Sequence, residues 1–256
     1  MIDNLRNQFA ASFLGLARRL ATDQGWARLS DAVGAPNMRA GLWRLRDRGF
    51  RPQIVVDGGA CVGDWTLLFH SVFPDAKILM VEPQAPHFDV LSALAARRAT
   101  HRKVVSTLLG PPGMNSAPFV VLDDASGGTG SSVLSEISDV PRHVVETPVT
   151  TLDKLVLERG FGFPDFIKLD VQGFEIEVLK GAAEALKRAD FVLLEVGVRN
   201  YNKGAPLLHE VLQWMHGQGF NMYELFDLSR RSDILVQLDL LFARIGSKAI
   251  PADPND

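Results

Sequence analysis

A carboxylate and three glycines follow the first strongly apolar run of this 256-residue chain. In the stretch IVVDGGACVGDW, residues 54–65, Asp57 precedes Gly58 and Gly59, and Gly63 comes four residues after Gly59. Glycines in such a loop allow the backbone to approach a ligand where a side chain would collide. Their spacing differs from the G-x-G-x-x-G pattern that binds the pyrophosphate of dinucleotides. Because an unpaired carboxylate at Asp57 would repel a phosphate, the loop favours a cofactor with positive charge and no phosphate, such as S-adenosylmethionine.

A second carboxylate stands at the end of the next apolar run, ILMV. Glu82 lies about nineteen residues after Gly63, and a carboxylate at that strand tip can accept hydrogen bonds from both hydroxyls of a ribose. NAD and S-adenosylmethionine both contain this diol, so Glu82 alone does not distinguish them. The choice of S-adenosylmethionine therefore rests on Asp57 and on the glycine spacing. The alternative for Glu82 is an ordinary solvated loop residue.

The elements that position these groups are predicted by the apolar pattern. The first fifty residues have helical spacing, with Asn37 able to cap one helix and Gly49 able to end it. Further along, the short β-branched runs QIVVD, AKILMVE and KVVSTLL alternate with helical patterns. This alternation predicts crossover units and a parallel sheet covered on both faces, which is an α/β fold.

The second half of the chain departs from this alternation once and then resumes it. Residues 117–124 and 143–152 are predicted to be two antiparallel strands around a mobile excursion of small and polar residues. The crossover pattern resumes with a strand at DFIKLDV and a single helix over 174–188. The runs NMYELFDL and DLLFARI are expected to pair as a hairpin at the edge of the sheet.

Composition excludes several classes of function. A net charge of -3 argues against a nucleic-acid surface, and a single cysteine excludes a disulfide within the chain and a cysteine-rich zinc site. No apolar run is long enough to cross a bilayer, so we expect no stable membrane insertion and a cytoplasmic location. The expected organisation is a helical segment over 1–50, one domain over 51–247 and a flexible tail over 248–256.

Four stretches together resemble the FkbM family of S-adenosylmethionine-dependent methyltransferases. They are IVVDGGACVGDWT, ILMVEP, TTLDKL and, most specifically, FIKLDVQGFEIEVLKGA, and the similarity extends over roughly residues 50–245. The resemblance implies the class I methyltransferase fold, which is Rossmann-like, with a seven-stranded, mostly parallel sheet and helices on both faces. It also implies methylation of hydroxyl oxygens on natural products or sugars. The chain departs from the family's frequent Asp-x-Glu-Gly sequence, because Gln172 stands at the second acidic position.

Methyl transfer requires an aligned acceptor and removal of its proton. Asp170, at the end of a predicted strand, is a candidate to orient or deprotonate the acceptor, or else to cap the helix that begins near Phe174. Glu195 ends the following strand and could face the same cleft. His143 follows the mobile excursion and could reach the site as a base. Glu175 is a candidate to bind substrate, or else an acidic residue favoured by the helix dipole.

The remaining site predictions concern loops. Ser131 and Ser132 could bind a polar acceptor, and Ser106 and Thr107 could meet the adenine edge. No oxygen-rich ligand set for a metal is evident. The predicted cofactor-binding residues are Asp57, Gly58, Gly59, Ala60, Gly63, Glu82, Pro83, Ser106, Thr107 and Asp170.

The expected activity is therefore O-methylation of a small polar molecule, natural product or sugar. The helical first fifty residues are expected to cover the acceptor cleft or to form an oligomer contact, as in a homodimer. Two other classes stay open: a nicotinamide-dependent oxidoreductase, although a tyrosine-lysine pair at the usual spacing is absent, and a methyltransferase fold without activity.

Overall fold

The computed structural model describes residues 22–122, 130–135, 139–200 and 202–249, together with Gly15 and Ile137. The predicted helix before residue 22, most of the excursion between the two antiparallel strands, and the tail from residue 250 lie outside the described residues.

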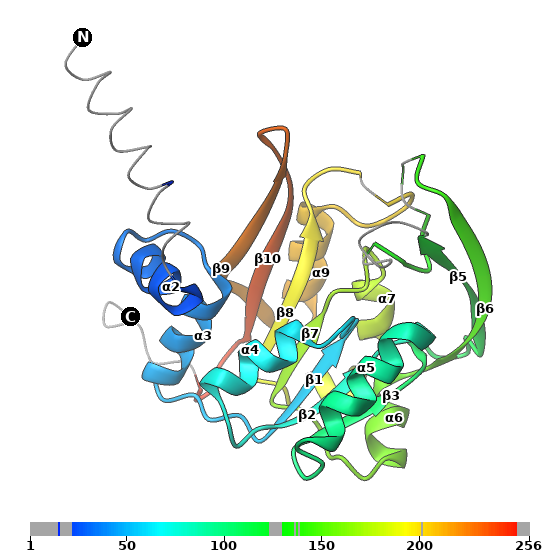
Figure 1. Cartoon of the computed structure of the whole chain (residues 1–256), viewed down its shortest axis with the longest axis horizontal. Helices are drawn as coiled ribbons and strands as arrows, with labels where there is room; N and C mark the ends of the chain where they lie inside the picture. Colours follow the sequence, from blue (N-terminus) through cyan, green and yellow to red (C-terminus); the bar gives the residue numbers. More distant parts are fainter. Residues whose placement is uncertain are drawn as a thin grey trace.

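The main sheet has seven strands in the order β3-β2-β1-β7-β8-β10-β9. All neighbouring strands pair in parallel except that β10 runs antiparallel to both β8 and β9. The topology confirms the predicted class I methyltransferase fold, and β9 and β10 form the predicted hairpin at one edge (Figure 1). The strands are β1 Ile54–Gly58, β2 Lys77–Val81, β3 Arg102–Val105, β7 Phe166–Leu169, β8 Phe191–Gly197, β9 Phe220–Arg231 and β10 Ile234–Arg244.

Helices cover both faces of this sheet, because its strands are apolar on both sides. On one face, visible in front in Figure 1, Leu42 of α3 and Phe69 of α4 belong to the same buried cluster as Val55 and Leu193 of the sheet. This face carries α2 Asp23–Ala32, α3 Met38–Asp47, α4 Asp64–Val72 and α5 Ala85–Ala96. On the other face lie α6 Leu152–Glu158, α7 Glu175–Lys180, α8 Ala183–Leu186 and α9 Leu208–Gly217.

A local signal places the start of α3 correctly, whereas a longer helical pattern fails. The Asn37 side chain accepts a hydrogen bond from the Ala40 backbone N–H at 3.1 Å and so caps α3, as predicted. The single helix predicted over 174–188 is wrong, because α7 and α8 are separated at Gly181. A Cβ at Gly181 would lie 2.2 Å from the Gly110 carbonyl oxygen, so the backbones approach closely there. Asp153 then caps α8 by accepting from the Glu184 backbone N–H at 2.8 Å.

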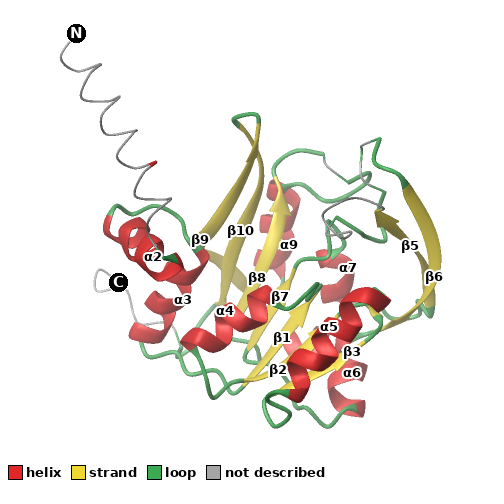
Figure 2. Cartoon of the chain, in the orientation of Figure 1, coloured by secondary structure: helices red, strands yellow, loops and turns green. Residues whose placement is uncertain are grey.

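A smaller sheet stands beside the main one (Figure 2). It consists of β4 Leu108–Leu109, β6 Arg142–Thr150 and β5 Ser116–Leu122, in that order, and β5 and β6 are antiparallel as predicted. The predicted single strand KVVSTLL is instead divided between the two sheets, with Ser106 and Thr107 at the crossing. The Thr107 hydroxyl donates to the Pro148 carbonyl at 3.1 Å, which directs the chain from β3 toward β6.

Candidate active site

One cavity of about 190 Å³ lies where the carboxyl ends of β1, β2 and β7 meet the small sheet. Ligands of doubly wound sheets bind at such strand ends. Its polar lining includes Glu82, Thr107, Ser131, Ser132 and Asp170. Its apolar lining includes Leu108, Leu109, Phe119, Val133 and Phe174.

The glycine loop is shaped first of all by contacts within the chain. Gly59 has φ +73°, and a Cβ there would lie 1.9 Å from the backbone oxygen of Asp170. Gly63 has φ +91°, begins α4, and would place a Cβ 2.5 Å from Leu94. Gly59 lines the cavity, whereas Gly58, Ala60 and Gly63 lie outside the described lining. Gly59 and Gly63 are therefore required by the packing of the loop against neighbouring segments of the chain.

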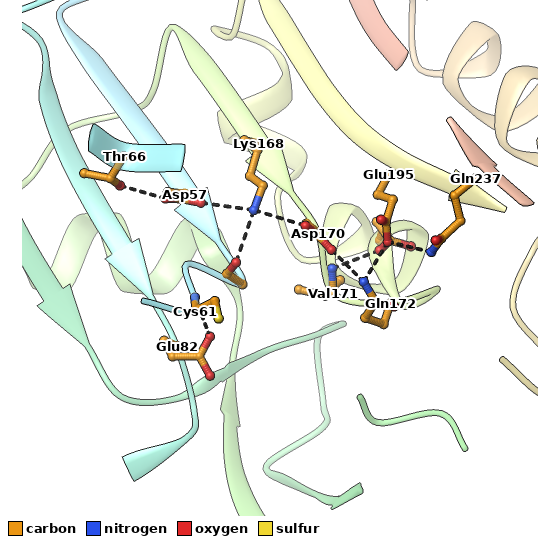
Figure 3. A network of polar contacts seen from close by, with 12 residues as sticks. Asp57, Cys61, Thr66, Glu82, Lys168, Asp170, Val171, Gln172, Glu195 and Gln237 are labelled. Carbon is orange, nitrogen blue, oxygen red and sulfur yellow. Dashed lines mark hydrogen bonds and ion pairs between the residues drawn. The ribbon is translucent and has the colours of Figure 1, made fainter. Parts of the chain in front are cut away.

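Asp57 is fully buried and lies outside the described lining of the cavity. Its Oδ2 accepts a hydrogen bond from the Thr66 hydroxyl at 2.7 Å, and its Oδ1 lies 3.3 Å from Nζ of Lys168 (Figure 3). The premise that Asp57 is an unpaired carboxylate is therefore wrong. A buried carboxylate is costly without such a partner, so Asp57 is an internal support of the loop.

Lys168 is a central residue that the sequence analysis missed. It lies in β7 with 9% of its side chain exposed, 3.1 Å from the Gly59 carbonyl oxygen and 3.6 Å from Oδ2 of Asp170. Burial alone would lower the pKa of Lys168, but the carboxylates of Asp57 and Asp170 outweigh burial and raise it. The signal was present in the run FIKLD, since a lysine inside a buried strand requires an anionic partner.

Glu82 lines the cavity and is held by the glycine loop. Its Oε2 accepts from the Cys61 backbone N–H at 2.9 Å and its Oε1 accepts from the Gln84 backbone N–H at 3.0 Å (Figure 3 shows the first contact). Only 4% of Glu82 is exposed, and His87 Nδ1 lies 3.6 Å from Oε1. Each carboxylate oxygen keeps a further acceptor position, so Glu82 can accept hydrogen bonds from a diol in the cavity.

Of the other loop residues predicted to lie at the site, some line the cavity and one does not. Pro83 and Thr107 line it, whereas Ser106 lies outside the described lining and its hydroxyl is 3.4 Å from the Pro83 carbonyl. Ser131 and Ser132 also line the cavity, and their hydroxyls form hydrogen bonds with the backbone of neighbouring segments. Ser131 accepts from a backbone N–H of β5, and the single O–H of Ser132 is shared between two carbonyl oxygens in the loop after β7, each at 3.1 Å.

Asp170 presents a partly exposed carboxylate to the cavity, with 36% of its side chain accessible. Its Oδ1 accepts from the Gln172 side-chain amide at 2.9 Å. The alternative role as a helix cap is not supported, because the cap residue of α7 is Phe174. Glu175 instead closes this loop by accepting from the backbone N–H groups of Val171 at 2.9 Å and Gly173 at 3.1 Å.

Glu195 and Glu175 lie behind Asp170 and outside the described lining of the main cavity. Both line a much smaller cavity of about 20 Å³. Burial, and then the carboxyls of Asp170 and Asp239, raise the pKa of Glu195 well above its ordinary value. Burial also raises the pKa of Glu175 to about 7, and burial together with neighbouring carboxyls does the same for Asp239. The protonation of Glu175 and Asp239 therefore changes near neutral pH.

His143 lies in β6 opposite Val121 and outside the described lining of the main cavity. Among the described residues, no group of three or more His, Cys, Asp or Glu side chains is arranged to hold a metal ion. No described helix has the length and apolar character that a membrane span requires.

Comparison with known proteins identifies the family of the chain. Residues 57–222 match the methyltransferase FkbM domain, and the chain belongs to this family. The methyl donor of the family is S-adenosylmethionine, so this is the cofactor of the class. A curated relative, the 31-O-demethyl-FK506 methyltransferase FkbM of Streptomyces tacrolimicus, is 26% identical over 194 residues, which cover 66% of this chain and 73% of the relative.

Two solved methyltransferase structures have a limited similarity to the chain. Magnesium protoporphyrin IX methyltransferase of Synechocystis PCC 6803 with bound S-adenosylmethionine has a TM-score of 0.46 and 11% identity, covering 85% of this chain and 79% of that chain. Precorrin-6y C5,15-methyltransferase of Geobacter metallireducens GS-15 has a TM-score of 0.46 and 12% identity, covering 81% and 87%.

Proposed function

We propose that this chain transfers a methyl group from S-adenosylmethionine to a hydroxyl oxygen of a small polar molecule, natural product or sugar. The observation that carries the proposal is the placement of two carboxylates with different surroundings on one cavity. Glu82 is nearly buried and held by backbone N–H groups, whereas Asp170 is partly exposed. The first suits a fixed binding contact and the second suits contact with an acceptor.

The lining of the cavity fits the cofactor. None of the described lining residues is a lysine or an arginine, which suits a ligand with positive charge and no phosphate. Glu82 would hold the ribose hydroxyls, and the apolar side chains from β4 and β5 would contact the adenine. S-adenosylmethionine supplies an already activated methyl group, so the protein mainly has to align the acceptor.

Asp170 would accept the hydrogen bond of the acceptor hydroxyl and take up its proton as the new bond forms. The name of the curated relative, a 31-O-demethyl-FK506 methyltransferase, supports oxygen as the methylated atom. Ser131 and Ser132 would form the wall against the acceptor, with their hydroxyls holding the neighbouring loops.

Isothermal calorimetry with S-adenosylmethionine and NAD, on the wild type and on Glu82→Ala, is the decisive first experiment. We expect selective binding of S-adenosylmethionine, weakened about tenfold or more in the variant because hydrogen bonds to a charged group are lost. Binding of NAD alone, or of neither compound, would refute the proposal. If binding is selective, transfer of labelled methyl to hydroxylated and amine acceptors then tests oxygen against nitrogen, and lack of transfer to any acceptor would favour an inactive binding module.

A further inference from the structure

Gln172 occupies a position between two carboxyls at the end of the sheet. Its side-chain Nε2 donates to Oδ1 of Asp170 at 2.9 Å and to Oε2 of Glu195 at 2.7 Å (Figure 3). An amide nitrogen has two N–H groups, so these contacts use its full donor capacity. Gln172 therefore links a carboxylate on the cavity to a carboxyl behind it.

The backbone of Gln172 is held from several directions, so its side chain has little freedom to leave this position. The residue has φ +57°, a conformation that non-glycine residues rarely adopt. Its carbonyl oxygen accepts from the Ser132 hydroxyl at 3.1 Å and from the Asn202 side-chain amide. The neighbouring backbone N–H groups of Val171 and Gly173 are bound by Glu175. Strain of this kind persists where surrounding contacts fix the conformation, and it is concentrated at functional sites.

We propose, on the basis of the proposed methyl transfer, that Gln172 is a positioning residue that fixes the Asp170 carboxylate toward the acceptor by joining it to Glu195 in one hydrogen-bonded unit. With its Oδ1 held by Gln172 and its Oδ2 near Lys168, Asp170 keeps one orientation while its exposed part faces the cavity. The amide at position 172 can donate to both neighbours at once, whereas an ionised carboxyl there would place three acidic groups in contact.

Gln237 provides a matched control. Its side-chain Nε2 donates to the same Oε2 of Glu195 at 2.9 Å, and its described contacts do not include Asp170. Glutamine and glutamate have nearly the same shape, so Gln172→Glu and Gln237→Glu make the same chemical change on two sides of Glu195. Only Gln172→Glu changes the hydrogen bond to Asp170.

The pH response of this unit depends on all the charged groups that face it. The titratable groups are Cys61 from the loop after β1, Lys168 from β7, Glu175 from α7 and Asp239 from β10, together with Asp57 of β1, which acts on Lys168, and Asp227 of β9, which acts on Asp239. Every variant keeps these groups, so differences between variants report on position 172 or 237 alone.

The first measurement is the thermal unfolding midpoint of Gln172→Glu and Gln237→Glu, each alone and combined with Asp170→Asn. Asparagine at 170 restores a donor opposite a glutamate at 172, so we expect it to recover at least half of the loss of midpoint caused by Gln172→Glu. It should recover none of the loss caused by Gln237→Glu. If Asp170→Asn recovered the same share of the midpoint loss in Gln172→Glu and in Gln237→Glu, the proposed link between Gln172 and Asp170 would be overturned. This measurement needs no cofactor.

The second measurement is the affinity for S-adenosylmethionine at pH 6 and pH 8. In Gln172→Glu the ratio of the two affinities should differ from the wild-type ratio by about tenfold, because an added carboxyl shares protons with Asp170 at the cavity. In Gln237→Glu the ratio should change by about twofold at most, because the described contacts of Gln237 reach Glu195 and not Asp170 on the cavity. An equal loss at both pH values in Gln172→Glu would show a merely structural role and overturn the inference.

A wild type that binds no S-adenosylmethionine would refute the proposed function, and the positioning role with it. The unfolding midpoints of Gln172→Glu with and without Asp170→Asn would then still decide whether the hydrogen-bonded unit exists. The two failures are therefore distinguishable.

Discussion

The loop after β1 and the loop after β7 meet at the same cavity but differ in how their charges are balanced. At the end of β1, directly before its loop, Asp57 is fully buried and is compensated by Thr66 and Lys168. In the loop after β7, Asp170 is partly exposed and is followed by carboxyls whose pKa values are raised, Glu175 among them. The first loop is organised for rigidity, and the second keeps groups whose protonation can change near neutral pH. The difference teaches that adjacent strand ends can combine a buried, compensated charge with carboxyls whose pKa values are raised by burial.

Lys168 connects the two loops, so its removal should have the largest effect. Lys168→Met leaves Asp57 as an uncompensated buried charge, and we expect a loss of about 3–5 kcal/mol in the free energy of unfolding. Urea denaturation followed by circular dichroism measures this loss. Lys180→Met is the control, because Lys180 forms an exposed pair with Glu177, and its effect should be about 1 kcal/mol or less. Similar losses in both variants would contradict the internal role of Lys168.

The second largest effect is expected where the two loops touch, at Gly59 and the backbone of Asp170. Gly59→Ala combines a positive φ with a Cβ 1.9 Å from the Asp170 carbonyl oxygen, so we expect about 3 kcal/mol of destabilisation. Gly113→Ala has a φ of +86° and no atom within 4 Å of the added Cβ, so only the backbone cost of about 1–2 kcal/mol applies. The difference between the two urea midpoints isolates the steric contact, and equal midpoints would show that the loops can separate without cost.

Measuring the free energy of unfolding as a function of pH tests the raised pKa of Glu175 in the segment after β7. The pKa of Glu175 rises from an ordinary value near 4.5 to about 7 on folding, so the folded state binds more protons than the unfolded state between these values. Stability should therefore fall as the pH rises from about 4.5 to 7, and Glu175→Gln should reduce this fall by about 2–3 kcal/mol. The glutamine oxygen can still accept from the same backbone N–H groups. An unchanged slope in the variant would contradict the raised pKa.

The smallest effect is expected at His143. Because it lies outside the described lining of the cavity, His143→Gln should leave the affinity for S-adenosylmethionine and the rate of methyl transfer within about twofold of the wild type. Calorimetry and a labelled-methyl assay measure both quantities. A loss of rate of about a hundredfold, the size expected for a general base, would place the base in the small sheet and not at Asp170.

Particular residues show how far the sequence could be interpreted. The strand-end positions of Asp57, Glu82 and Asp170 were predictable, because apolar runs identify strands and parallel strands end at one edge. Their surroundings were not, since Asp57 and Lys168 are 111 residues apart in the chain and meet only across β1 and β7. The division of 174–188 into two helices was equally inaccessible, because it depends on the approach of Gly181 to Gly110.

The sequence by itself determined the class of this protein: a parallel α/β sheet, a glycine loop at its first strand end, and the motifs of the FkbM family. Local patterns suffice for these features, because strand and helix periodicity and glycine conformation are properties of short segments. Only the tertiary structure decided which carboxylates are compensated, which face the cavity and which keep a proton. Those properties depend on burial and on the distance between charges from different strands, and neither quantity exists until the chain is folded.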